Sequence, residues 1–367
     1  MLVATPATDR PFGTHAAVAA EGQLLLAVEL SHRLGALGAA VSPLPFEAAP
    51  DDRPFHWGRW FVAGARRALQ AGSVDAVGYA GAGAAALLDD AGLDALLSPI
   101  PGEVVANNRF SADAFVVAAD LDRALAVLEG CDSDNGAPRA LNEAGWAWRD
   151  LGATSWARFD VDTTLDLALL RLATRIDGSR PLDGSVRGFL EMARLPGDRP
   201  LEVPNVDEIA AVMRDRSAEL VVAGRVPMTT WQALETETAC RVRCLVEERG
   251  MRSAPGTGQA PRSILAALMA RSSPTDLVAE LARLGDAVVL DTRVLMAAVS
   301  GSAHAGDWPP EEERFASDFA DASRVATPWL RELVEAAEDA PVPFLLGGHA
   351  LVSDGLRLIV AAAWQGR

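Results

Sequence analysis

Short apolar runs alternate with longer segments of helical periodicity along the first half of the chain. The segment "AEGQLLLAVELSHRLGALG" predicts a helix, because Leu26, Leu30, Leu34 and Leu37 recur at helical spacing. Strands are predicted at "MLVATP", "AAVSPLPF", "VDAVGYAG", "GEVVANN", "DAFVVAAD" and "GWAWRDL", with helical segments between most of them. Helices that alternate with short apolar strands favour a mostly parallel sheet that is covered on both faces.

A polar stretch rich in Pro and Gly, near residues 178–205, interrupts this alternation. Beyond it, strands are predicted at "AELVVAGRV", "RVRCLVEER", "DAVVLDTRVLM" and "VPFLLGG", again with helices between them. A chain of 367 residues is long enough for two domains. We therefore expect an α/β protein with two three-layer α/β/α domains, residues 1–180 and 206–367, joined by a linker over 181–205. The second domain is expected to be Rossmann-like.

The charge of the chain narrows the range of partners. The formal net charge is −17, from 33 basic and 50 acidic residues, and an acidic surface repels the phosphates of nucleic acids and anionic lipids. We therefore expect neither a nucleic acid nor a membrane as partner. The chain has no lysine, which excludes a Schiff-base lysine and a phosphate-loop lysine. An anionic ligand must then be bound by arginine, by backbone N–H groups or through a metal.

Three further features favour a cytoplasmic protein. The longest apolar runs fall short of the roughly 18–20 residues that a membrane span needs. The segment "MLVATPATDRPFG" lacks the basic and apolar regions of a secretory signal. The three cysteines follow neither a metal-binding nor a disulfide pattern. The oligomeric state stays open, with a homodimer as one alternative.

Ligands of open parallel sheets bind beyond the carboxyl ends of the strands, so polar residues that follow strands are the candidates. In "FDVDTTLDL", Asp160 and Asp162 alternate on an extended segment and point to the same side, where they could share a divalent ion. The alternative is structural. Asp162 or Thr163 would cap the following helix, with Asp166 in its first turn.

A second candidate is the segment "ANNRFSADAF" between two predicted strands. Within residues 107–113 it concentrates hydrogen-bond donors, a cation and a carboxylate, carried by Asn107, Asn108, Arg109, Ser111 and Asp113. These residues predict a binding site for a polar or anionic ligand. A turn and a surface ion pair would explain the same residues.

The second half offers three candidates, Asp291, Arg293 and His349. Asp291 and Arg293 follow a predicted strand on one face, and the alternative to a ligand site is an internal ion pair to a neighbouring strand. His349 follows two glycines at a predicted helix start, where an anion is favoured and the imidazole could bind it or move protons. The alternative is a tight turn capped by the histidine. Together the three residues could form a phosphatase or sugar-phosphate site.

One segment carries a resemblance to a known family. "FDVDTTLDL" resembles the D-x-D/N-T-P-x-D-L signature of nucleotidyltransferases of the molybdenum-cofactor guanylyltransferase type, with Thr164 at the place of the proline. The segments "EGQLLLAVELSHRL" and "GRWFVAGARRALQAGSVDAVGYAGAG" follow the order of the family, so the resemblance covers roughly residues 1–175. It implies a nucleotidyltransferase-like (GT-A-like) first domain that binds an NTP or a phosphorylated small metabolite. It also implies Mg²⁺ at Asp160 and Asp162.

The chain departs from this family at two places. The Gly-rich triphosphate loop of the family corresponds to "ATPATDRPFG", which keeps Arg10 and Gly13 but has two prolines and no lysine. The strand that delivers the first metal-binding Asp in the family ends in Gly81-Ala82-Gly83. Two hypotheses follow. In one of them the chain is an enzyme, in the other its first domain is not catalytic, and the sequence does not decide between them.

In the first hypothesis the protein transfers nucleotidyl groups in a Mg²⁺-dependent reaction, with Asp113 and Asp162 as catalytic candidates. Arg10 and Arg109 would neutralise phosphate. In the second, the first domain is a catalytically degenerate binding or assembly module, and any activity lies in the C-terminal domain.

Overall fold

The computed structural model describes residues 1–7, 9–46, 55–70, 72, 74–109, 111–151, 156–176, 182–248 and 260–365. The chain divides into two compact units. The first unit comprises Met1–Arg10, Ala19–Asp162 and Arg180–Phe189. The second comprises Pro11–Val18, Thr163–Ser179 and Leu190–Arg367. Each unit is therefore built from segments that are separated in the sequence.

The first unit contains most of the elements of the N-terminal half. In chain order they are β1 (Leu2–Thr5), α1 (His15–Ala36, of which the first residues belong to the second unit), β2 (Ser42–Pro45), α2 (Trp57–Leu69), β3 (Ala76–Ala80), α3 (Asp90–Leu97), β4 (Glu103–Ala106), β5 (Ala114–Ala118), α4 (Leu121–Glu129), η1 (Asp134–Gly136), α5 (Ala137–Glu143), β6 (Ala147–Asp150) and η2 (Trp156–Arg158).

Six strands of the described residues form the sheet of the first unit, in the order β2-β1-β3-β5-β4-β6. β1 runs parallel to β2 and β3, and β4 runs parallel to β6. β5 is antiparallel to both of its neighbours, β3 and β4. The amino end of β5 therefore lies at the same edge of the sheet as the carboxyl ends of β3 and β4.

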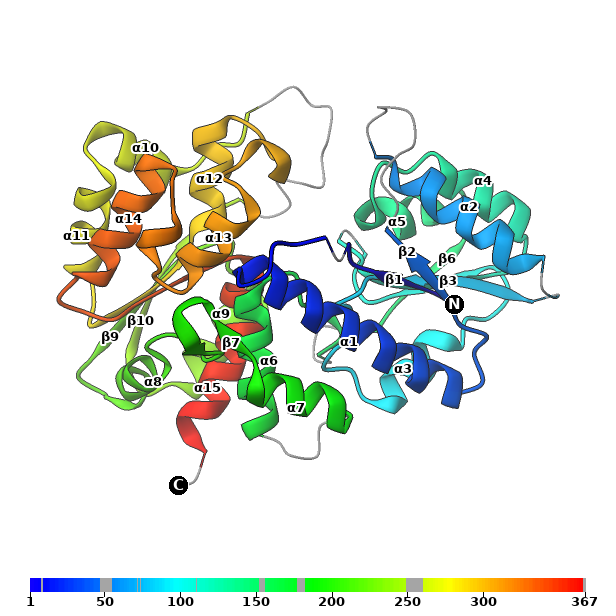
Figure 1. Ribbon diagram of the computed structural model, residues 1–367, viewed down its shortest axis with the longest axis horizontal. Coiled ribbons are helices and arrows are strands. Elements are labelled where there is room, and N and C mark those ends of the chain that lie inside the picture. The colour runs from blue at the N-terminus through cyan, green and yellow to red at the C-terminus, as the bar shows by residue number, and fades with distance from the viewer. Residues whose placement is uncertain are drawn as a thin grey trace. The chain divides into compact units, whose positions relative to one another are not determined.

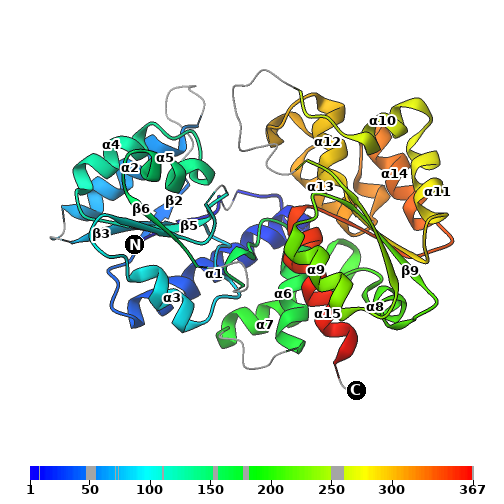
Figure 2. The ribbon, with the colours of Figure 1, turned by 180° about the vertical axis from the view of Figure 1, so that it is seen from behind.

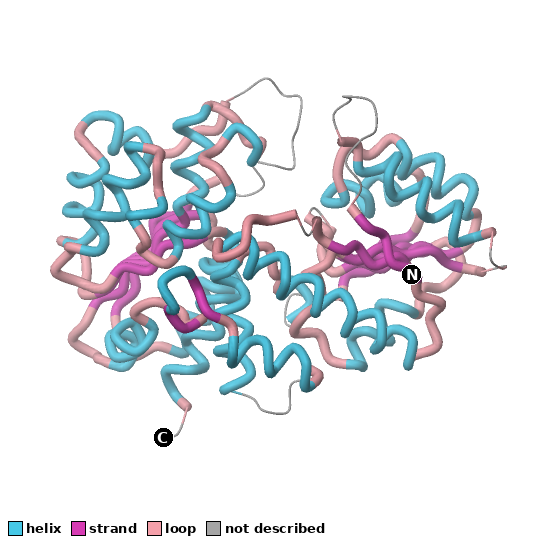
Figure 3. Tube along the Cα trace, viewed as in Figure 1, coloured by secondary structure: helices cyan, strands magenta, loops and turns pink. Residues whose placement is uncertain are grey.

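Helices cover both faces of this sheet, as the magenta strands between cyan helices in Figure 3 show. α2, α4 and α5 lie on one face, where Phe61, Leu125 and Leu141 join Phe115 of the sheet in one core. α1 and α3 lie on the other, where Leu30 and Leu93 pack in a second core (Figure 1). Burial of these side chains supplies the main stabilisation, at about 25 cal/mol per Å² of apolar surface.

The second unit contains the remaining elements. They are α6 (Thr164–Ile176), α7 (Gly184–Met192, which begins in the first unit), β7 (Arg194–Leu195), η3 (Pro196–Asp198), β8 (Arg199–Pro200), α8 (Val206–Arg214), β9 (Glu219–Gly224), α9 (Met228–Glu237), β10 (Arg241–Val246), α10 (Ile264–Arg271), α11 (Pro274–Ala282), β11 (Ala287–Asp291), α12 (Thr292–Ser300), η4 (Ala305–Asp307), α13 (Glu311–Asp318), η5 (Ala322–Arg324), α14 (Pro328–Glu338), β12 (Phe344–Gly347), the π-helical turn η6 (Leu351–Gly355) and α15 (Leu356–Trp364).

The main sheet of the second unit has four strands among the described residues, in the order β10-β9-β11-β12, and all of them are parallel. The strands β9, β11 and β12 are buried along almost their whole length. α10 to α14 cover one face and share a core with residues such as Val288 and Leu290. α15 packs with α6, α8 and α9 (Figure 2). Strands buried on both faces explain the nearly continuous apolar runs in the sequence.

The expected mixed α/β class with mostly parallel sheets is confirmed. In the segment "DAVVLDTRVLM", predicted as a strand, the strand ends at Asp291 and the chain continues as α12. The Asp291 side chain accepts a hydrogen bond from the Arg293 N–H at 3.1 Å and so caps that helix. The stretch 181–205, expected to be a linker, contains α7, β7 and β8, because Val186 and Leu190 supply a buried helix face.

None of the helices in the described ranges combines the length and the apolar content that a bilayer crossing requires.

Candidate functional site

Three segments that are far apart in the sequence meet at one edge of the first unit's sheet. The Gly81 N–H donates to the Asp113 carbonyl at 2.8 Å, and the Val161 N–H donates to the Gly83 carbonyl at 3.2 Å. A Cβ at Gly83 would overlap the Val161 backbone, so only glycine allows this approach. The segment with the paired acids therefore lies directly against the end of β3, where the family resemblance expects its first metal ligand.

Asn107 organises the loop between β4 and β5. Its side chain is 1% exposed, and its Oδ1 accepts from the N–H groups of Asp113 and Ala114 at 3.0 and 3.1 Å. Its Nδ2 donates to the Ala157 carbonyl at 3.0 Å and to Asp113 Oδ2 at 3.3 Å. Two acceptor sites and two donor hydrogens are all that an amide offers. Asn107, predicted as a ligand-binding residue, is therefore occupied in positioning Asp113.

The remaining residues of the "ANNRFSADAF" segment contact the neighbouring helices. Arg109 is exposed, donates to Asn142 Oδ1 at 2.9 Å and lies 5.9 Å from the centre of the Trp148 ring. The Ser111 hydroxyl donates to Asn135 of η1. Asn108 is half-buried. Asn107 bonds Ala157 and Asp113 bonds Gly81, close to the acid segment, whereas Arg109 and Ser111 contact α5 and η1.

The paired acids flank a fully buried residue. Val161 is 0% exposed, Asp160 is half-buried and Asp162 is exposed, as expected for alternation along an extended segment. The Val161 carbonyl accepts a hydrogen bond from Gln23 Nε2 at 2.8 Å, which fixes this segment against α1. The two acids are therefore more exposed than the valine between them.

A separate pair of residues caps the helix that follows. The Asp166 carboxylate accepts from the Thr163 N–H at 2.8 Å and from its hydroxyl at 2.9 Å, and the Thr163 hydroxyl accepts from the Asp166 N–H at 3.3 Å. These reciprocal bonds resemble a capping box, with Asp in the place of Glu. Of the two capping residues predicted, the structure shows this role for Thr163.

Among the described residues, no three or more His, Cys, Asp or Glu side chains gather as a metal site. Magnesium does not require such a cage, because one or two carboxylates together with substrate phosphates commonly hold it. Arg10 forms a 3.9 Å pair with Asp9 in the first unit, whereas Gly13 belongs to the second unit and has a positive φ of 76°. The two retained residues of the expected triphosphate loop therefore fall in different units.

The carboxyl edge of the second unit's sheet holds a buried ion pair. Arg225 follows β9, and its Nε and Nη2 donate to the two carboxylate oxygens of Asp291 at 2.6 and 3.0 Å. Asp291 is 0% exposed, and its pKa lies below the usual range: burial raises the pKa, but the charge and hydrogen bonds of Arg225 together with the charge of His349 outweigh burial. The alternative of an internal ion pair to a neighbouring strand is confirmed for Asp291.

The geometry around this pair is tight. Gly224, which precedes Arg225, has a φ of 137°, and a Cβ there would overlap the Asp291 side chain. In the sheet register, Asp291 lies opposite Gly347, two residues before His349. The strand order reverses between β9 and β11, and ligands of open α/β sheets bind at such a point.

Arg293 makes a second buried pair, but with a helix rather than a strand. Its Nη1 and Nη2 donate to Asp318 of α13 at 2.7 and 2.6 Å. Burial lowers the pKa of Arg293, but the charge and hydrogen bonds of Asp318, together with the charges of Asp291 and Asp166, outweigh burial and raise it. A few residues upstream of Asp318 in α13, Glu312 accepts from the Ala16 N–H at 3.0 Å and bonds His15 Nδ1 at 3.1 Å.

The sequence analysis did not single out Arg225, Asp318, His15 or Glu312. A signal exists only for Arg225, a glycine-arginine pair at the end of an apolar strand. The partners of Asp318, His15 and Glu312 lie far away in the sequence, so no local pattern predicts these contacts.

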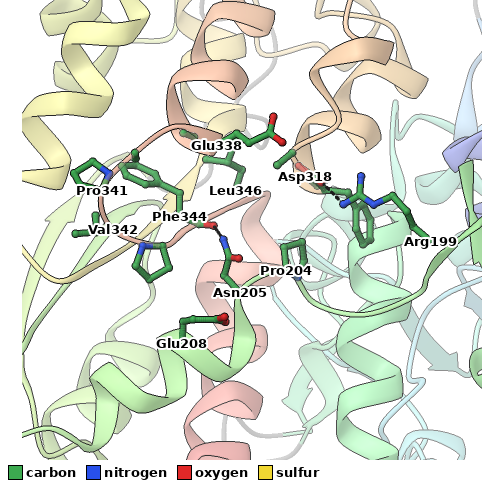
Figure 4. Close-up of a pocket in the computed structure, with 15 residues that line it drawn as sticks. Arg199, Pro204, Asn205, Glu208, Asp318, Glu338, Pro341, Val342, Phe344 and Leu346 are labelled. Atoms are coloured by element: carbon green, nitrogen blue, oxygen red, sulfur yellow. Dashed lines mark hydrogen bonds between the residues drawn. The ribbon is translucent and has the colours of Figure 1, made fainter. Parts of the chain in front are cut away.

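A pocket of about 500 Å³ lies beside the edge strand β12 of the second unit. Figure 4 shows Phe344 and Asn205 near its centre, with Glu338 and Glu208 on opposite sides. Asn205 has a positive φ of 53°, and its Nδ2 donates to the Phe344 carbonyl at 2.8 Å. Arg199 Nη2 donates to the Phe319 carbonyl at 2.8 Å. This volume falls within the range of small-molecule sites.

Comparisons of this chain with models of protein families, with curated proteins and with solved structures find no match.

Proposed function

We propose that the first unit binds a nucleotide or another phosphorylated small metabolite at the carboxyl edge of its sheet. The observation that carries this proposal is the Val161–Gly83 bond, which holds the segment with Asp160 and Asp162 against the end of β3. Ligands of open α/β sheets occupy this edge. The nucleotidyltransferase-like, GT-A-like fold implied by "FDVDTTLDL" is part of the same proposal.

Asp160 and Asp162 are proposed to bind a magnesium ion that arrives with the phosphates of the ligand. Thr163 and Asp166 cap the start of α6 through bonds to each other. Two carboxylates plus phosphate oxygens suit Mg²⁺, which keeps several waters and prefers octahedral oxygen ligands. The ion would neutralise phosphate charge that the acidic chain cannot neutralise alone.

Binding is favoured over efficient nucleotidyl transfer. Gly81 and Gly83 carry no side chain at the place of the first metal ligand, and the chain has no lysine for the triphosphate. Asp113 is the remaining catalytic candidate near this edge, because its backbone contacts Gly81 and its carboxylate contacts Asn107. We therefore propose a binding module in the first unit, with slow transfer as the lesser alternative.

A second candidate function lies in the second unit, which we propose to be Rossmann-like. The buried Arg225–Asp291 pair lies where the strand order reverses, and His349 begins the helix after β12. This observation favours a phosphate-handling site there. Arg225 to Ala should then weaken inorganic phosphate binding without changing any nucleotide response of the first unit.

The main test is a thermal-shift series with GTP, CTP and UTP, each with and without Mg²⁺. We expect one nucleotide to raise the melting temperature in a Mg²⁺-dependent manner. Asp162→Ala should abolish that rise and leave the ligand-free melting temperature within a few degrees. Asp166→Ala is the matched control, because it removes a helix cap and should lower the ligand-free melting temperature but keep the nucleotide rise.

Pyrophosphate release under the same conditions separates binding from transfer. No Mg²⁺-dependent response to any of the three nucleotides, or a rise that survives Asp162→Ala, contradicts the proposed site.

A further inference from the structure

We propose that the first unit binds a purine nucleotide, whose base stacks on an aromatic platform formed by Phe46, Phe55 and Trp60. This inference rests on the function proposed above, because it assumes phosphates at the sheet edge that carries Asp160 and Asp162. It adds the class of the base and the residues that bind it.

Two exposed rings form the outer part of the platform. Phe46 follows β2 and Phe55 precedes α2, and their side chains are 46% and 43% exposed. The centres of the two rings lie 5.0 Å apart. Among the exposed phenylalanines and tryptophans of the described residues, these two form the pair with a ring contact. Apolar residues scattered singly over a surface are normal, whereas contiguous ones commonly mark a binding site.

Further ring contacts connect the platform to the core. Phe55 meets the Trp60 ring edge-on with the centres 5.7 Å apart, and Trp60 meets the buried Tyr79 of β3 in the same way at 6.4 Å. Trp60 Nε1 donates to the Pro45 carbonyl at 2.9 Å, which ties the indole to the end of β2. The rings are therefore positioned before a ligand arrives, which lowers the entropy cost of stacking on them.

The platform lies at the same edge of the sheet as the paired acids. The Phe46 N–H donates to the Thr5 carbonyl at 3.2 Å, which joins the end of β2 to the end of β1. The other neighbour of β1 is β3, which is followed by Gly83 and its bond to Val161. Neighbouring strands are about 4.8 Å apart, so β2 and β3 are separated by roughly 10 Å. An extended nucleoside triphosphate is long enough to span this distance.

The chemistry of the platform favours a planar aromatic ring. Aromatic side chains stack with every base, because each base has a π face, and the strength of stacking sets a modest preference among bases. A purine has two fused rings and so covers more of the platform than a pyrimidine does. A nucleic acid is a poorer candidate, because the formal net charge of −17 repels a chain of phosphates. A mononucleotide brings its own Mg²⁺.

Isothermal titration calorimetry of the full chain in the presence of Mg²⁺ tests this inference with three probes. They are GTP, UTP and inorganic tripolyphosphate, which carries linked phosphates without a base. We expect GTP to bind at least about threefold more tightly than UTP and at least about tenfold more tightly than tripolyphosphate. UTP binding as tightly as GTP overturns the assignment of a purine.

The same titrations separate this inference from the proposed function. Equal affinities for GTP and tripolyphosphate overturn the aromatic platform and leave the phosphate site standing. Binding of none of the three probes contradicts the proposed function itself, and this inference with it.

Variants locate the platform. Phe46→Ala and Phe55→Ala should each weaken GTP binding about tenfold and leave tripolyphosphate binding unchanged. Phe55→Trp keeps an aromatic face and should bind GTP like the wild type. The matched control is Trp364→Ala, at an aromatic side chain of the second unit with a similar exposure of 42%, which should leave GTP binding unchanged.

The ligand-free melting temperature of each variant shows whether it is folded. GTP binding that is unaffected in both folded alanine variants of the platform, or that is weakened equally by Trp364→Ala, contradicts the assignment.

Discussion

Glu29 is a buried acid in α1 whose protonation should control the stability of the first unit. Its side chain is 5% exposed. It lies beside a pocket of about 330 Å³ next to Leu182 and Asp183, just before α7. Burial, followed by the charge of Asp183, raises the pKa of Glu29 from 4.5 to about 7, although Arg33 and Arg187 favour the ionised form.

The direction and size of the effect follow from this rise. A carboxyl whose pKa is higher in the folded state stabilises the fold in its neutral form. Its contribution is complete below pH 4.5 and is lost as the pH rises through about 7. At about 1.4 kcal/mol for each pKa unit, the loss above pH 8 is roughly 3 kcal/mol. Glu29→Gln mimics the neutral acid and should recover that energy only at high pH.

The assay is thermal or urea unfolding of the wild type and Glu29→Gln at pH 5 and pH 8.5. One kcal/mol shifts the melting temperature of a unit of this size by about 2–4 °C, so we expect a gain of roughly 6–12 °C at pH 8.5. At pH 5 the gain should be within about 3 °C. Glu21→Gln, at an exposed position of the same helix, is the control and should change little at either pH. Equal shifts at both pH values, or a Gln variant less stable than the wild type at pH 8.5, would refute the reasoning.

Two further substitutions test the buried pair and the helix cap. Arg225→Met strands the charge of Asp291 in the core and should cost about 3–5 kcal/mol in urea unfolding, whereas Arg243→Met, at an exposed pair, should cost at most about 1 kcal/mol. Similar losses in both variants would contradict the role of burial. Thr163→Ala should cost about 1 kcal/mol by removing the cap of α6. An unchanged stability, with the loss seen in Asp162→Ala instead, would assign the cap to Asp162.

Much of the fold could be predicted from periodicity, because buried strands and amphipathic helices leave strong local patterns. Three features could not. The antiparallel direction of β5 depends on its pairing with β3 and β4, which the apolar run "DAFVVAAD" does not encode. The change from β11 to α12 occurs within one apolar run, and the capping bond of Asp291 decides it. In α7, two glycines obscure a short helical pattern in a segment otherwise typical of a linker.

The candidate sites were predictable only in part, because contacts between residues that are distant in the sequence leave no local pattern. Asp160 and Asp162 follow from local alternation, and in the structure both are more exposed than Val161 between them. Asn107 has the composition of a binding residue, yet its four hydrogen bonds serve the fold. Asp291 has its main partner in Arg225, 66 residues earlier, and such pairs become visible only when the strands are placed side by side.

The bond between His15 and Glu312 joins positions 297 residues apart, and α1 contributes residues to both units. During synthesis, the start of α1 leaves the ribosome long before Glu312 and Phe319, its contacts in the second unit, exist. The start of α1 therefore lacks these contacts during most of translation. Closing so long a loop costs conformational entropy, which is offset only once the late contacts form. Gene fragments cut between residues 181 and 205 would separate the second unit from residues 11–18 and 163–179, so co-expressed halves should have to reassociate before either is complete.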